Sequence, residues 1–147
     1  MSKSSSVKVQ VFSDIVCPWC FIGKRRWDSV IKELTEVDVE LIWRPYQLYP
    51  GLPYEGIDRL EYLRRRYGDS AVNRSVPRRI ADEAKSVGIE LRYYLIRKIP
   101  NTAYAHYLLE WSLEFGLQND LAEALFQAYF CRGVDAVSYT HLRAHET

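Results

Sequence analysis

The start of the chain alternates between strand-like and helix-like patterns. Val7–Phe12 ("VKVQVF") alternates apolar and polar positions and is rich in β-branched residues, which predicts a strand. Val37–Tyr46 alternates in the same way, and Pro45 predicts that this second strand ends in a loop. The segment between them, Pro18–Leu34, has helical periodicity, so the three elements predict a βαβ unit with parallel strands. The helix positions expected on its buried face are Trp27, Val30, Ile31 and Leu34.

After a turn-rich linker at Pro50–Gly56, the pattern is mostly helical. The periodicity predicts helices over Ile57–Tyr67 and Val76–Val87, whereas the apolar run Ile89–Ile96 fits either a strand or an extended loop. Two more helices are expected on either side of Gly116. Their expected buried faces are Tyr104, Leu108, Trp111 and Phe115 in the first and Leu121, Ala124, Leu125 and Ala128 in the second, and Tyr93 and Tyr94 are expected in the core.

Composition narrows the class of protein. The 147 residues are 48% hydrophobic and 27% charged, which is typical of one globular domain. A net charge of +1 gives no indication of a nucleic-acid or membrane partner, and no apolar run is long enough to span a bilayer. The opening "MSKSSSVKVQVF" lacks the features of a secretory signal, so we expect a cytoplasmic protein. In that compartment a close cysteine pair predicts metal binding or catalysis rather than a structural disulfide.

The last eleven residues, "VSYTHLRAHET" at 137–147, resemble a translated sequencing-library adaptor. We interpret them as non-native and leave them out of the fold prediction. On this interpretation the natural sequence is interrupted at about Ala136.

Two cysteines, Cys17 and Cys20, stand at the expected start of the first helix with Pro18 and Trp19 between them. Unpaired backbone N–H groups and the helix dipole stabilise negative charge there, so we expect Cys17 to have the lower thiol pKa. Cys20 follows one turn later and could close a small disulfide ring. The spacing therefore favours redox chemistry, in which one cysteine attacks a disulfide and the other resolves the mixed disulfide.

A metal site is the weaker interpretation of the same pair. Structural zinc needs four ligands, and once the tail is excluded only His106 and Cys131 remain as nitrogen or sulfur candidates. Neither has paired spacing, so we predict no metal, although an incidental cysteine pair stays an alternative.

Three other residues have open interpretations. His106 could lie near the site or be a hydrogen-bonded histidine of a packed helix, and Asp14 could tune a thiol pKa or cap a turn. Cys131 is expected to be an inert thiol.

Four stretches, in order, carry a family resemblance: "SDIVCPWCFIGKRR" at Ser13–Arg26, "WRPYQLYPGLP" at Trp43–Pro53, "IPNTAYAHYLLEWS" at Ile99–Ser112 and "LAEALFQAYFCRGVD" at Leu121–Asp135. Together they resemble DsbA-like thiol–disulfide oxidoreductases of the FrnE type. The resemblance implies an α/β, thioredoxin-like fold, with residues 1–55 as its N-terminal βαβ half and residues 56–136 as a helical insertion.

The same resemblance implies the chemistry. Cys17 would attack and Cys20 resolve, with Pro18 and Trp19 tuning the active site. Partners would be protein or small-molecule thiols and disulfides, with no cofactor, and glutathione is possible as a redox partner. The family's C-terminal half, which carries a cis-proline loop facing the cysteines, has no counterpart here because the last proline is Pro100. We therefore expect this chain to be weakly active or inactive.

Two alternatives remain open at this point. The same superfamily includes hydroxychromene-carboxylate isomerases and kappa-class glutathione transferases, in which a serine that acts with glutathione typically matches Cys17. Cysteines at both positions favour redox chemistry. The second alternative is a non-catalytic binding module in which the pair is idle.

Overall fold

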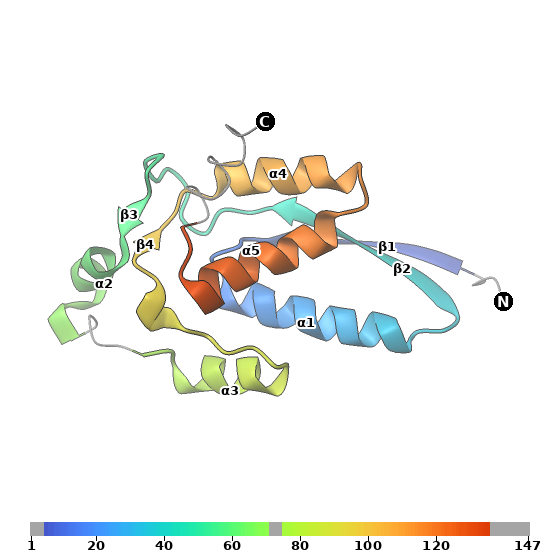
Figure 1. Ribbon diagram of the computed structural model, residues 1–147, viewed down its shortest axis with the longest axis horizontal. Helices are drawn as coiled ribbons and strands as arrows, with labels where there is room; N and C mark the ends of the chain where they lie inside the picture. Colours follow the sequence, from blue (N-terminus) through green and yellow to red (C-terminus); the bar gives the residue numbers. More distant parts are fainter. Residues whose placement is uncertain (1–4, 71–74, 136–147) are drawn as a thin grey trace.

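The computed structural model describes residues 5–70 and 75–135, so the adaptor-like segment 137–147 lies outside the described residues. Within these ranges, strands and helices form a mixed α/β structure (Figure 1). No helix among them is both long and apolar enough to cross a bilayer. In chain order the elements are β1 (Ser5–Ser13), α1 (Pro18–Glu33), β2 (Val37–Pro45), β3 (Ile57–Asp58), α2 (Arg59–Tyr67), α3 (Arg78–Ser86), the 3₁₀ turn η2 (Tyr93–Leu95), β4 (Lys98–Ile99), α4 (Ala103–Leu113) and α5 (Gln118–Arg132).

The predicted βαβ unit is confirmed. β1 and β2 pair in parallel, with α1 as the crossover between them. The register sets Val9 beside Leu41 and Val11 beside Trp43. Because side chains alternate along a strand, these four residues share one face of the sheet.

That face packs against α1 and α5, and Phe21 joins the two helices. Its ring has no exposed surface and stacks on Phe126 of α5 at 5.1 Å between centroids. Trp43 of β2 meets the same Phe126 ring edge-on at 6.4 Å. The face predicted for α1 was partly wrong: Val30 and Leu34 are exposed, whereas Phe21 and Ile22 in the first turns are fully buried. The helix is most deeply buried at its N-terminal end, where α5 covers it.

The edge of β2 away from β1 is covered by a side chain rather than by a strand. Gln118, at the start of α5, is buried, and its Oε1 accepts a hydrogen bond from the Trp43 N–H at 2.8 Å. Its Nε2 donates to the Trp43 carbonyl at 3.0 Å and to the Leu109 carbonyl of α4, also at 3.0 Å. The amide thus replaces a neighbouring strand at one residue and ties α4 and α5 to the sheet.

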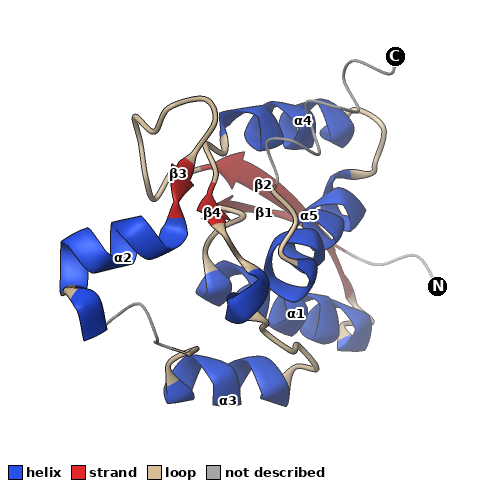
Figure 2. Cartoon of the chain, turned by 60° about the vertical axis from the view of Figure 1, so that its left-hand side comes forward, coloured by secondary structure: helices blue, strands red, loops and turns tan. Residues whose placement is uncertain are grey.

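The segment between β2 and α4 differs from the prediction in two places. The helix expected from Ile57 begins at Arg59, because Ile57 and Asp58 pair as β3 with Ile99 and Lys98 of β4. The Asp58 carboxylate then caps α2 by accepting from the Glu61 N–H at 2.8 Å. Figure 2 shows β3 and β4 side by side, with α2 continuing from β3. The ambiguous run 89–96 contains a 3₁₀ turn and no strand.

The stripe predicted for α4 was also wrong. Trp111 and Phe115 are each 60% exposed, and Tyr104 is exposed as well. The buried face consists of the smaller side chains Ala105, His106, Leu109 and Ser112. Small side chains on this face allow α4 to approach β2 and α5 closely. The opposite face of α4 is also apolar, so periodicity alone could not predict which face is buried. Tyr94, another expected core residue, is 80% exposed, and Ala124 of α5 also points to solvent.

The Gln118→Ala variant should lower the free energy of unfolding by about 2–4 kcal/mol, because it leaves the main-chain N–H and carbonyl of buried Trp43 without their partner. Chemical denaturation measures the change. Gln127→Ala is the matched control, since Gln127 lies exposed on the same helix, and it should change stability by less than about 0.5 kcal/mol. Equal losses for the two variants would contradict the role assigned to Gln118.

Candidate active site

The two cysteines lie where the turn after β1 becomes α1. Cys17 is the N-cap residue of α1 and has extended backbone angles, and Pro18 is the first helical residue. The Cys17 N–H donates to the Asp14 carbonyl at 3.1 Å, and the Cys20 N–H donates to the Cys17 carbonyl at 3.2 Å. Both cysteines are half-buried free thiols. The position predicted for the pair, after a strand and at a helix start, is confirmed.

The two thiols share a hydrogen bond, so their titrations are coupled. The hydrogen bond with the Cys17 thiol, helped by one from the Ser13 side chain, lowers the pKa of Cys20 to about 6, although burial opposes the shift. The hydrogen bond with Cys20, together with burial, raises the pKa of Cys17. In the dithiol form these hydrogen bonds favour a thiolate on Cys20 over one on Cys17.

This order is the reverse of the one expected from the helix start. Backbone N–H groups of Trp19 and Cys20 do lower the pKa of Cys17, as the helix-start argument requires. The hydrogen bond between the sulfurs outweighs them. Cys20 also receives a hydrogen bond from the Asp14 N–H, so the turn before the helix supplies its own donors.

A buried carboxylate lies directly behind this turn. Asp14 is only 2% exposed, and its Oδ2 accepts from the Leu48 N–H at 2.8 Å. Its Oδ1 lies 3.2 Å from Nε2 of His106, which is also buried. Both interpretations of His106 therefore hold, because it is a hydrogen-bonded histidine of a packed helix and it lies next to the active-site turn. Asp14 likewise acts on the thiols, since its negative charge raises the pKa of Cys20.

The remaining predicted residues lie as follows. Trp19 is 41% exposed, and the Arg79 guanidinium lies over its ring at 5.7 Å. Cys131 is half-buried on α5, and burial raises the pKa of its thiol. Sequence reasoning missed Ser13, whose side chain hydrogen-bonds Cys20. Its position at the end of β1, four residues before Cys17, could have indicated that it lies near the cysteines.

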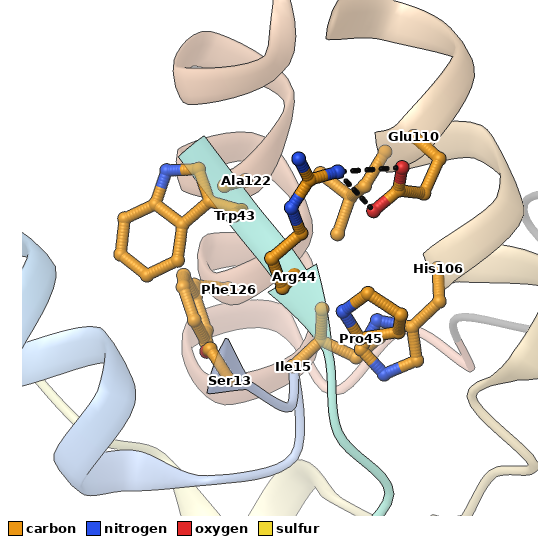
Figure 3. A pocket seen from close by; sticks show the side chains of 10 residues that line it. Ser13, Ile15, Trp43, Arg44, Pro45, His106, Glu110, Ala122 and Phe126 are labelled. Atoms are coloured by element: carbon orange, nitrogen blue, oxygen red, sulfur yellow. Dashed lines mark hydrogen bonds and ion pairs between the residues drawn. The ribbon is translucent and has the colours of Figure 1, made fainter. Parts of the chain in front are cut away.

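A small cavity between β2, α4 and α5 has no room for a ligand. Its volume is about 10 Å³, which is room for one water molecule at most. Figure 3 shows the His106 ring beside Pro45 and the Arg44 side chain reaching Glu110 of α4. Among the described residues, histidine, cysteine, aspartate and glutamate side chains nowhere gather in a group of three that could hold a metal ion.

Comparison with known proteins identifies the family. A family model for the DSBA-like thioredoxin domain matches residues 8–144. The chain belongs to this family. The DsbA-like domain is 28% identical over 125 residues to the uncharacterized protein YwbO of Bacillus subtilis (strain 168). It also superimposes on a probable DsbA oxidoreductase from Streptomyces coelicolor with a TM-score of 0.71 and 23% sequence identity, a likeness that shows the thioredoxin-like fold.

The matches cover most of this chain but only part of the relatives. They include 85% of the chain and 57% of YwbO, and 94% of the chain and 62% of the Streptomyces protein. The DsbA-like domain thus spans less than two thirds of the length of either protein. The predicted DsbA-like family and the α/β, thioredoxin-like fold are confirmed.

Titration of the Cys17–Cys20 pair tests these pKa directions in a Cys131→Ala background, which removes the third thiol. The intact pair should release its first proton near pH 6, the pKa of Cys20. Cys17→Ala should raise the pKa of Cys20, because the largest lowering interaction is lost. Cys20→Ala should lower the pKa of Cys17, because the hydrogen bond that raises it most is lost. Rates of alkylation against pH measure both values, and shifts in the opposite directions would contradict the assigned hydrogen bond.

Asp14→Ala should lower the free energy of unfolding by about 2–4 kcal/mol, since the Leu48 N–H and His106 would lose their buried partner. Denaturant titration checks this. Asp120→Ala is a suitable control, because Asp120 is an exposed carboxylate in the first turn of α5 and should contribute no more than about 1 kcal/mol. A loss no larger than that of the control would show that the carboxylate does not hold the turn.

Proposed function

We propose that the protein is a thiol–disulfide oxidoreductase of the FrnE type, which exchanges disulfides with protein or small-molecule thiols through Cys17 and Cys20. The observation that carries the proposal is a pair of free thiols at a helix start that shares one hydrogen bond, within a DsbA-like domain. Two sulfurs that share a proton supply one thiolate near neutral pH, which is the reactive form in disulfide exchange.

The proposed reaction has two steps. Cys17 passes its proton to Cys20 across their hydrogen bond and attacks one sulfur of the substrate disulfide, which forms a mixed disulfide and releases the first substrate thiolate. Cys20 gives this proton to the released thiolate, attacks the Cys17 sulfur, closes the Cys17–Cys20 disulfide and releases the second thiolate. The two cysteines lose two electrons and the substrate gains them. The reverse sequence oxidises a dithiol.

The roles of the neighbouring residues follow from their positions. Pro18 supplies no N–H, so the N–H groups directed at Cys17 are those of Trp19 and Cys20. Trp19 offers an exposed aromatic surface next to the reacting sulfurs for substrate contact. The mechanism needs no cofactor, glutathione is one possible thiol partner, and the cytoplasmic location expected from the sequence is part of the same proposal.

Single-cysteine variants test the proposal. In a Cys131→Ala background, Cys17→Ala should abolish reduction of a disulfide-bonded protein such as insulin. Cys20→Ala should stop after the first step and accumulate one mixed disulfide per chain, visible by mass spectrometry. Cys131→Ala alone should keep the parent rate, because Cys131 takes no part.

Full exchange activity in Cys17→Ala would overturn the proposal. Activity that depends on added glutathione and survives Cys17→Ser would favour the isomerase or transferase alternative. Cysteines that fail to react even with a small aromatic disulfide, which needs no protein-binding groove, would favour the binding module.

A further inference from the structure

A cavity of about 330 Å³ opens beside the active-site cysteines. Val16 and Pro18, the residues on either side of Cys17, both line it. The volume lies in the range of small-ligand sites, about 300–1,000 Å³. A ligand-sized space is therefore lined by both sequence neighbours of the residue that would attack the substrate.

Tyrosines form much of the wall. Tyr49 and Tyr62 meet edge to face at 5.5 Å between ring centroids, and the Tyr129 hydroxyl donates to the Lys98 carbonyl at 3.4 Å. Burial raises the pKa of Tyr93 to about 12, and it also raises those of Tyr49 and Tyr129. All three phenols are therefore neutral at physiological pH, so they bring aromatic surface and hydroxyl groups but no negative charge.

Arg59 is the cation of this cavity. Its guanidinium lies over the Tyr93 ring at 5.2 Å, and it lines the cavity together with Tyr49, Tyr93 and Tyr129. Its positive charge lowers the pKa of all three tyrosines. A negative charge on Cys17 also raises the pKa of Tyr93, so the charges of Cys17 and Arg59 both act on one ring of the cavity wall.

The backbone fixes Arg59 in this position. It is the first residue of α2, and its N–H donates to the Arg97 carbonyl at 2.9 Å next to the β3–β4 pair. In the part of the chain that the structure describes, no carboxylate forms an ion pair with its guanidinium. A guanidinium stacked on a ring keeps its in-plane N–H donors, which suit a carboxylate.

We propose that this cavity binds a low-molecular-weight disulfide that carries a carboxylate, or the thiol derived from it, with the carboxylate on Arg59 and the reacting sulfur at Cys17. The inference rests on the proposed exchange reaction and names its substrate class. An uncompensated cation in a partly enclosed aromatic cavity attracts an anion more strongly than an exposed arginine does, because solvent screens it less. The exchange step itself is unchanged: Cys17 bonds to one substrate sulfur, and the other leaves as a thiolate.

Two aromatic disulfides of similar size test the proposal in a Cys131→Ala background. Dithiobis(nitrobenzoate) carries carboxylates, and dithiodipyridine is neutral at the assay pH. Both release a coloured thiol, so stopped-flow absorbance gives the second-order rate constant for each. The quantity of interest is the ratio of the anionic to the neutral rate constant.

Arg59→Gln should lower this ratio about tenfold, the effect of losing one charge-assisted hydrogen bond, and leave the neutral rate within about twofold. Arg59→Lys should keep a larger part of the preference, because the charge remains. Arg65→Gln is the matched control, since it removes the same charge from an exposed position of α2 and should leave the ratio unchanged. Circular dichroism verifies that each variant is folded.

The outcomes separate this inference from the proposed function. If Cys17 and Cys20 in the Cys131→Ala protein fail to react with dithiodipyridine, the proposed disulfide exchange itself is refuted. If the neutral rate persists and Arg59→Gln leaves the ratio unchanged, or lowers it no more than Arg65→Gln does, the substrate class is wrong. Should Arg59→Gln not fold, Arg59→Lys should lower the ratio more than Arg65→Gln does, because lysine lacks the planar pair of N–H donors that binds a carboxylate. Equal ratios in Arg59→Lys, Arg65→Gln and the parent overturn the inference.

Discussion

One buried carboxylate holds the active-site turn in place. Asp14 lies between the end of β1 and the start of α1, and its two oxygens bind the Leu48 N–H and His106. Its main chain adds two contacts at the same point, because its carbonyl accepts from the Cys17 N–H and its N–H donates to Cys20. The residue thus joins β1, the loop after β2, α4 and the cysteine pair, and removal of its carboxylate would leave buried polar groups on two of these segments.

The charge distribution at the cysteines follows from this local network more than from the helix. The start of α1 favours a thiolate on Cys17 through two N–H groups. Cys20 accepts hydrogen bonds from the Cys17 thiol, the Ser13 side chain and the Asp14 N–H, and the Asp14 charge opposes them only in part. Direct hydrogen bonds to a half-buried sulfur thus favour a thiolate on Cys20, against the effect of the helix start on Cys17.

The surrounding structure brings distant segments to this turn. Stacking of Phe21 on Phe126 fixes the N-terminal end of α1 against α5, and the Gln118 amide fixes α5 to the free edge of β2. On the other side, the β3–β4 pair sets the first residue of α2, Arg59, beside the Tyr93 ring and the cavity next to Cys17. The reactive thiols therefore lie at the start of α1, whereas the cation proposed to bind the substrate, Arg59, lies at the start of α2.

The sequence by itself determined the βαβ unit and the place of Cys17 and Cys20 at a helix start, because period-two and helical patterns are local properties of a chain. It could not determine which face of α4 is buried, since Trp111 and Phe115 are as apolar as the residues that pack. It also gave no indication that Arg59 lines one cavity with the two neighbours of Cys17, or that the thiol–thiol hydrogen bond favours the charge on Cys20. Only the tertiary structure decided these points, because each depends on contacts and distances between side chains that the backbone pattern leaves open.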